Sequence, residues 1–194
     1  GVALNILRFD KYVLLPEWFT GLQAGIGEVL ISLGFAAGSE QFGSLVQFTS
    51  IISISGLLLK IFEKKNLFSS KYLIILIILS CPILIFLLSG NKPQIFFSGL
   101  IFLALCLSFL KLENIKQIFI NYGLINILIC LSVMAKFSFG LSGFLVWTIY
   151  TTKLIYKKKY KIVFFVPLLV FLIIFFPFLY FKFLNLGGNL FNYI

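Results

Sequence analysis

Long apolar stretches, separated by short charged segments, are the feature that most constrains the fold of this 194-residue chain. Two of them, residues 72–89 and 162–181, contain almost no hydrophilic side chain. A helix needs about 20 predominantly apolar residues to cross a hydrocarbon core of roughly 30 Å. Only 11% of the residues are charged, which is too few for the surface of a soluble domain. The sequence therefore predicts an all-α, polytopic bundle of transmembrane helices.

We expect three sections along the chain. Residues 1–39 form an external acidic segment, residues 40–183 the transmembrane bundle, and residues 184–194 the truncated start of a further external segment. In the first section, small and polar residues recur at helical spacing. They predict an interfacial or partly re-entrant helix over residues 22–37. These residues are Gly21, Gly25, Glu28 and Ser32. About six spans follow, over residues 41–62, 72–89, 94–110, 117–134, 139–156 and 162–182.

The basic residues indicate how these spans are oriented. If the loop after the first span is cytoplasmic, eleven of the 16 basic residues lie on the inner side. They are Lys60, Lys64, Lys65, Lys71, Lys111, Lys116, Lys153, Lys157, Lys158, Lys159 and Lys161. The outer side receives Arg8, Lys11, Lys92, Lys136 and Lys182. This asymmetry is the positive-inside bias, and it predicts that residues 1–39 are non-cytoplasmic. The net charge of +10 forms no basic stripe with interleaved aromatics, so we expect no nucleic-acid partner.

The first expected span carries a ridge of polar residues at steps of three: Gln41, Ser44, Gln47, Ser50 and Ser53. Unsatisfied polar groups are costly in lipid, so this ridge must face other helices or a cavity. Interhelical hydrogen bonding and a cavity wall are the two interpretations, and the first is favoured.

Three carboxylates, Asp10, Glu17 and Glu28, fall in the external segment and are the candidate catalytic residues. A carboxylate at this position can accept a proton from an acceptor hydroxyl or help to hold a divalent cation. The alternative is that they are ordinary interfacial side chains. Glu28 differs from the other two because it lies within an apolar stretch, where an ionisable residue suggests function.

Two outer loops contain single lysines that could bind a lipid phosphate: Lys92 in SGNKPQ and Lys136 in AKFSFG. Each could equally extend to the lipid headgroups without a specific role. The chain has no histidine, and Cys81, Cys106 and Cys130 show no CxxC spacing. We therefore predict free thiols and no metal site built from these residue types. No cofactor is indicated with certainty, although a divalent cation is compatible with the external carboxylates.

Several segments together resemble the C-type membrane glycosyltransferases, including the protein O-mannosyltransferase-like and lipid A aminoarabinose transferase-like enzymes of bacteria. They are GIGEVLISLGFAAGSEQFGSLVQF (residues 25–48), SCPILIF (80–86), SGNKPQ (89–94), LSVMAKFSFGLSGFL (131–145) and LGGNLFNYI (186–194). The resemblance covers most of the chain. It implies transfer of a sugar from a polyprenyl-phosphate-linked donor to a lipid or protein acceptor, at the outer side of the bacterial inner membrane.

The resemblance also implies roles for individual residues. An acidic residue of the first external loop would act as general base, and Arg8, Lys92 and Lys136 would bind the lipid phosphate. In the family a leading acidic residue follows the first spanning helix, and we expect that position to lie upstream of Gly1. Asp10, Glu17 and Glu28 are then the remaining candidates.

A transporter or lipid-flipping module without glycosyl transfer is the principal alternative. It predicts ionisable residues near the centres of spans, or broken helices repeated in two halves. The sequence shows no internal repeat, and only Glu28 and Lys136 approach mid-span positions. A scaffold subunit with no chemistry is a third hypothesis.

Overall fold

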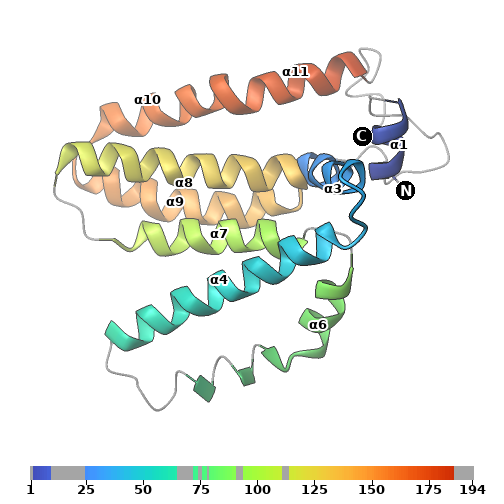
Figure 1. The fold of residues 1–194 in the computed structure, drawn as a ribbon. Helices are drawn as coiled ribbons and strands as arrows, with labels where there is room; N and C mark the ends of the chain where they lie inside the picture. The colour runs from blue at the N-terminus through green and yellow to red at the C-terminus, as the bar shows by residue number, and fades with distance from the viewer. Residues whose placement is uncertain are drawn as a thin grey trace.

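The computed structural model describes residues 2–9, 25–64, 72–73, 76–77, 79–90, 94–110 and 114–185. All regular structure in these residues is helical (Figure 1). The all-α prediction is therefore confirmed. The elements are α1 (Val2–Phe9), α3 (Ile26–Ala36), α4 (Phe42–Lys64), α6 (Pro82–Ser89), α7 (Gln94–Ser108), α8 (Ile115–Ala135), α9 (Phe139–Tyr156), α10 (Tyr160–Val170), a π-helical turn (Phe171–Phe175) and α11 (Phe176–Asn185).

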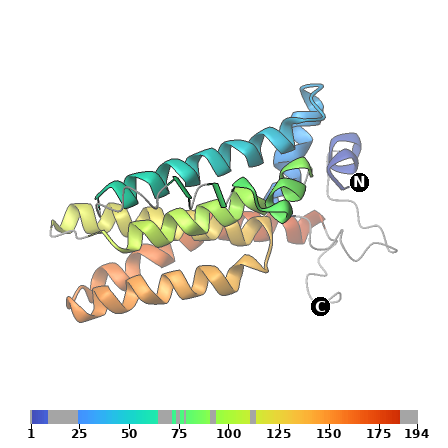
Figure 2. The same cartoon turned by 90° about the horizontal axis from the view of Figure 1, so that it is seen from below.

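Helix α8 is the centre of the bundle and packs against α7, α9 and α10 (Figures 1 and 2). It begins after Asn114, whose side chain accepts a hydrogen bond from the Lys116 backbone N–H at 3.0 Å. The core cluster combines apolar and tyrosine side chains from these helices. Its members are Ile101, Ala104, Ile118, Tyr122, Ile125, Val146, Tyr150, Leu154 and Val166.

Polar groups inside this core bind one another. The Tyr122 hydroxyl lies 2.9 Å from the Thr151 hydroxyl, and the Asn121 amide donates to the Tyr150 hydroxyl at 3.0 Å. Asn121 also donates to the Leu107 carbonyl oxygen at 3.1 Å. These pairs join α7, α8 and α9 without leaving the buried groups unsatisfied, as hydrocarbon surroundings require.

Three helices in the described part of the chain have the length and composition of a membrane span: Phe42–Ile61, Ile115–Ala135 and Tyr160–Phe181. Helices α6 and α7 form a fourth if they are one span bent by 119°. The sequence predicted about six. Two of the differences arise because α7 has only 15 residues and because the 18-residue α9 includes Lys153 and several threonines.

The expected continuous helix over residues 72–89 is interrupted. Cys81 is extended, with φ −69° and ψ 115°, and α6 begins at Pro82. A proline disfavours helical geometry at the preceding residue and supplies no backbone N–H, which accounts for the break. Ile83 and Phe86 are 70% and 75% exposed, so α6 has little cover from the rest of the protein.

The antiparallel helices give the bundle two ends with different charges. One end, here called the Lys136 end, holds α3, the start of α4 and the turn at 136–138 (Figure 1). The opposite end, here called the lysine-rich end, holds the turn at 157–159 and the starts of α8 and α10. The described basic residues that were predicted to be cytoplasmic lie toward the lysine-rich end, so the charge separation agrees with the predicted topology. Which end is cytoplasmic stays a prediction.

Candidate functional site

Lys136 lies at the C-terminal end of α8, where the chain turns into α9. Its backbone is extended, and its N–H donates to the Ser132 carbonyl oxygen at 3.1 Å, so the helix ends at this residue. The side chain is partly buried. This geometry directs the chain across the Lys136 end of the bundle and places the lysine beside a cavity.

The cavity has a volume of about 390 Å³ and lies between α4, α6, α7 and the turn after α8. Its polar lining residues are Gln94, Ser98, Lys136 and Ser138. The remaining lining residues are apolar: Ile51, Ile54, Leu84, Leu87, Ile95 and Phe139. Among the residues that the structure describes, one cation therefore borders a mostly apolar space, which is the combination that a phosphate carrying a hydrocarbon chain needs.

The polar ridge of α4 forms hydrogen bonds to the end of α6 and to the start of α7. Gln47 is fully buried and donates to the carbonyl oxygens of Leu87 and Gly90 at 2.7 and 2.5 Å, while the Ile95 N–H donates to Gln47 Oε1 at 3.2 Å. Ser50 also donates, to the Ile95 carbonyl oxygen at 3.3 Å. The favoured interpretation of the ridge as interhelical hydrogen bonding is thus confirmed for Gln47 and Ser50, whereas the Ser53 hydroxyl donates to the Thr49 carbonyl oxygen within α4. Apolar residues of α4 line the cavity.

Glu28 acts as a helix cap. Its carboxylate accepts a hydrogen bond from the Gly25 N–H at 2.9 Å, and its own N–H donates to the Gly25 carbonyl oxygen at 3.2 Å. The bond from the Gly25 N–H to the Glu28 carboxylate is the acidic half of a capping box, and Gly25 has no side chain that could form the other half. The carboxylate thus satisfies the backbone N–H that precedes α3. The polarity of Glu28 within an apolar stretch therefore has a structural explanation.

Helix α3 starts directly against the end of α8. A Cβ at Gly25 would overlap the backbone carbonyls of Met134 and Ala135, so only glycine fits this approach. The residues predicted to form a small and polar stripe face inward at Gly25 and Ser32, whereas Leu33 is 60% exposed. With 11 residues, α3 is too short to span a membrane, as predicted.

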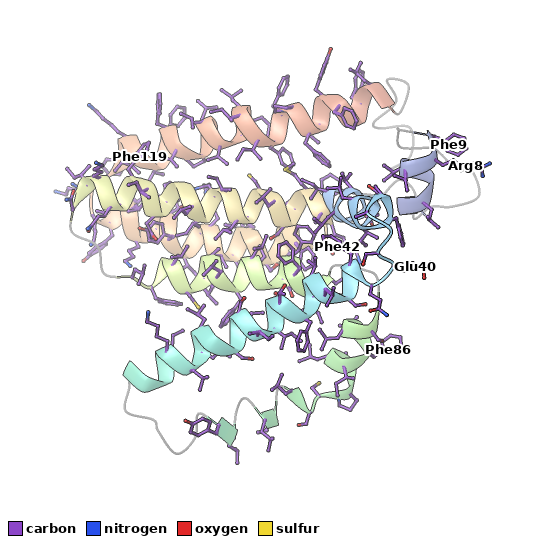
Figure 3. The ribbon with its side chains drawn as sticks, viewed as in Figure 1. Arg8, Phe9, Glu40, Phe42, Phe86 and Phe119 are labelled. Atoms are coloured by element: carbon purple, nitrogen blue, oxygen red, sulfur yellow. The ribbon has the colours of Figure 1, made fainter. Side chains whose placement is uncertain are left out.

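Arg8 lies on α1, which packs against α3. Its side chain is exposed, and the guanidinium carbon lies 5.6 Å from the centroid of the Phe9 ring (Figure 3). Through α1, α3 and α8, the structure therefore places Arg8, Glu28 and Lys136 at the same end of the bundle. The other predicted site residues, Asp10, Glu17 and Lys92, lie outside the described residues.

Within the part of the chain that is described, no group of three or more Asp, Glu, Cys or His side chains could hold a metal ion. The three cysteines are free and partly buried. The divalent cation that the external carboxylates allowed thus stays a sequence-based hypothesis.

Four residues that the structure places beside the cavity or at a helix end were not singled out from the sequence. Gln94 and Ser138 belong to the two loops that were predicted to be external, and Ser98 follows one helical turn after Gln94. Lys153 was assigned only to the inner side, yet its ammonium donates to the carbonyl oxygens of Ser108 and Leu110 at 3.0 and 2.9 Å. It therefore caps the end of α7, a contact between residues more than 40 positions apart that sequence spacing does not reveal.

Comparison with known proteins adds a family but no activity. The searches of curated proteins and of solved structures found no significant match. The sequence profile described as the DUF1420 N-terminal domain matches residues 1–194, which is the whole chain. The chain therefore belongs to the DUF1420 family, with the membrane helix bundle described above corresponding to its N-terminal domain.

Proposed function

We propose that this chain is the membrane part of a glycosyltransferase that uses a polyprenyl-phosphate-linked sugar donor, and that Lys136 binds the donor phosphate. The observation that carries the proposal is the cavity of about 390 Å³, in which Lys136 borders an apolar lining. The phosphate would pair with the ammonium group, and the first part of the polyprenyl chain would lie against Leu84 and Leu87 of α6.

The residues support a limited set of chemical steps. In the proposed transfer, the acceptor hydroxyl oxygen attacks the anomeric carbon, and the bond from that carbon to the phosphate oxygen breaks. Negative charge then grows on the departing polyprenyl phosphate, and Lys136 is placed to stabilise it. The Ser138 hydroxyl and the Gln94 amide are available to orient the sugar or phosphate oxygens. The Ser98 hydroxyl donates to the Ile95 carbonyl oxygen at 2.9 Å and can only accept a hydrogen bond from a sugar hydroxyl.

The general base is proposed to be Asp10 or Glu17. Glu28 is the weakest candidate because its carboxylate already accepts the Gly25 N–H. A base must reach the proton that it removes at about 3 Å, directly or through one water. A capping carboxylate would have to leave the helix terminus to do so.

Binding of a polyprenyl phosphate to the purified chain in detergent tests the first step. Charge-assisted hydrogen bonds contribute about 1.5–3 kcal/mol, so Lys136→Gln should weaken binding at least tenfold. Lys136→Arg should retain most of the affinity, and the matched control Lys60→Gln, an exposed lysine of α4 at the lysine-rich end, should not change it. The corresponding polyprenol without phosphate should bind wild type and Lys136→Gln equally.

Two outcomes would contradict the proposal. Equal affinity of wild type and Lys136→Gln for the polyprenyl phosphate would remove Lys136 from the phosphate site. Normal sugar turnover by a longer protein carrying Lys136→Ala would remove it from the reaction.

A lipid-flipping module is a second candidate, favoured by the 119° bend between α6 and α7 beside the cavity. Broken helices at a substrate site are a feature of transporters. The two functions differ in their products. Transbilayer movement of a labelled polyprenyl phosphate without a new glycosidic bond would favour this alternative.

A further inference from the structure

A second hollow lies at the opposite end of the bundle, between α8 and α10. It has a volume of about 610 Å³ and is open to the surroundings. Its lining residues are Phe119, Tyr160, Lys161, Ile162, Phe164 and Phe165. Figure 3 labels Phe119 at the start of α8, where α10 also begins. We call this hollow the α8–α10 groove.

The groove has a basic end and an apolar body. Tyr160 and Lys161 are in the first two positions of α10, next to the lysines at 157–159. Phe164 and Phe165 lie one turn further into the helix and are 74% and 61% exposed. The lining of the groove is therefore positively charged at the start of α10 and aromatic one turn further along the helix.

Several basic side chains with a described position lie around the basic end of the groove. The described basic residues near the groove include Lys116 at the start of α8 and Lys158, Lys159 and Lys161 around the turn into α10. Lys161 is the charged residue that lines the groove, so an anionic headgroup bound there pairs with Lys161, and the exposed lysines around it add only a weaker, screened attraction.

We infer that the α8–α10 groove binds an anionic glycerophospholipid, with the headgroup phosphate at Lys161 and an acyl chain against Phe119, Phe164 and Phe165. Two complementarities support this ligand. The charge fits an acidic headgroup, and the apolar body continues into the surface of a span that contacts hydrocarbon. Basic pockets between transmembrane helices are known to hold such headgroups. The inference does not depend on the proposed function, because it concerns the other end of the bundle.

Native mass spectrometry of the purified chain, with phosphatidylglycerol and phosphatidylcholine of identical acyl chains, tests the inference. Wild type should retain phosphatidylglycerol preferentially. One lysine near a lipid surface contributes about a fivefold effect, so Lys161→Gln should lower that preference about fivefold. Lys161→Arg should restore it, and thermal unfolding in phosphatidylcholine should be the same for all variants.

A matched control distinguishes lipid binding in the groove from general attraction of anionic lipid to surface lysines. Lys158 carries the same charge three residues away but does not line the groove, and its φ of 56° is compatible with asparagine. Lys158→Asn should therefore leave the phosphatidylglycerol preference nearly unchanged. An equal loss in Lys158→Asn and Lys161→Gln, or no loss in Lys161→Gln, would overturn the inference.

Discussion

Replacement of Gln47 by leucine should loosen the wall of the Lys136 cavity. The Gln47 side chain is fully buried, and its amide makes three hydrogen bonds across the α6–α7 break, to Leu87, Gly90 and Ile95. Such bonds contribute about 0.6 kcal/mol each on average in membrane bundles. The Ile95 N–H lies in the first turn of α7 and has no acceptor within that helix. When leucine replaces Gln47, this buried N–H loses its acceptor, which adds a desolvation cost of about 1 kcal/mol. Gln47→Leu should therefore lower the free energy of unfolding by about 2–3 kcal/mol.

Unfolding in mixed micelles with increasing SDS measures this difference. Ser53→Ala is the matched control on the same helix, because Ser53 is exposed and donates only to the Thr49 carbonyl oxygen. It should change the free energy by less than about 0.5 kcal/mol. Hydrogen exchange should also become faster for the Ile95 amide in Gln47→Leu. If both variants unfolded at the same SDS fraction with unchanged Ile95 exchange, the reasoning about this hydrogen-bond network would be refuted.

The other predictions concern single positions. Gly25→Ala should destabilise the fold by at least about 2 kcal/mol in SDS unfolding, because the new Cβ would overlap backbone carbonyls of α8. Gly123→Ala is the control, since a Cβ there meets nothing within 4 Å, and it should be neutral or stabilising. Ser55→Ala should cost nothing in the same assay, because the buried Ser55 hydroxyl has no hydrogen-bond partner among the described residues. By contrast, Ser132→Ala should cost about 1 kcal/mol through loss of the bond to the Phe97 carbonyl oxygen. Glu28→Gln should preserve both the α3 cap and sugar turnover of a longer protein, because an amide oxygen also accepts the Gly25 N–H. Loss of turnover at normal stability would instead identify Glu28 as a catalytic residue.

The general architecture could be predicted because hydrocarbon leaves few alternatives. Apolar stretches of span length must be helical, and the predicted boundaries at 139–156 coincide with α9. The polar ridge of α4 was also recognisable as a contact surface. Its partners were not, because the bonds from Gln47 reach backbone atoms 40 or more residues away.

The candidate site was predicted only in part. Lys136 was singled out as a cation in a loop predicted to be external, but the cavity beside it depends on how α4, α6 and α7 pack, which no local pattern encodes. Glu28 shows a different limit, since the sequence marks an isolated carboxylate in an apolar stretch but does not reveal its hydrogen bond to the Gly25 N–H. A catalytic role for Glu28 stays a prediction. The break at Cys81 was foreseeable from Pro82, although prolines within spans are often accommodated by kinks.

The measurement that tests the account most directly is the sidedness of the two ends of the bundle. In a protein with Cys81, Cys106 and Cys130 replaced by alanine, single cysteines would be placed at Glu40, at the exposed turn before α4 (Figure 3), and at Lys158. A membrane-impermeant thiol reagent added to intact cells should label Glu40→Cys, and should label Lys158→Cys only after permeabilisation. Labelling of both positions from the same side, or of Lys158→Cys alone in intact cells, would contradict the account, because the Lys136 cavity would then not face the compartment where the lipid-linked donor is proposed to react.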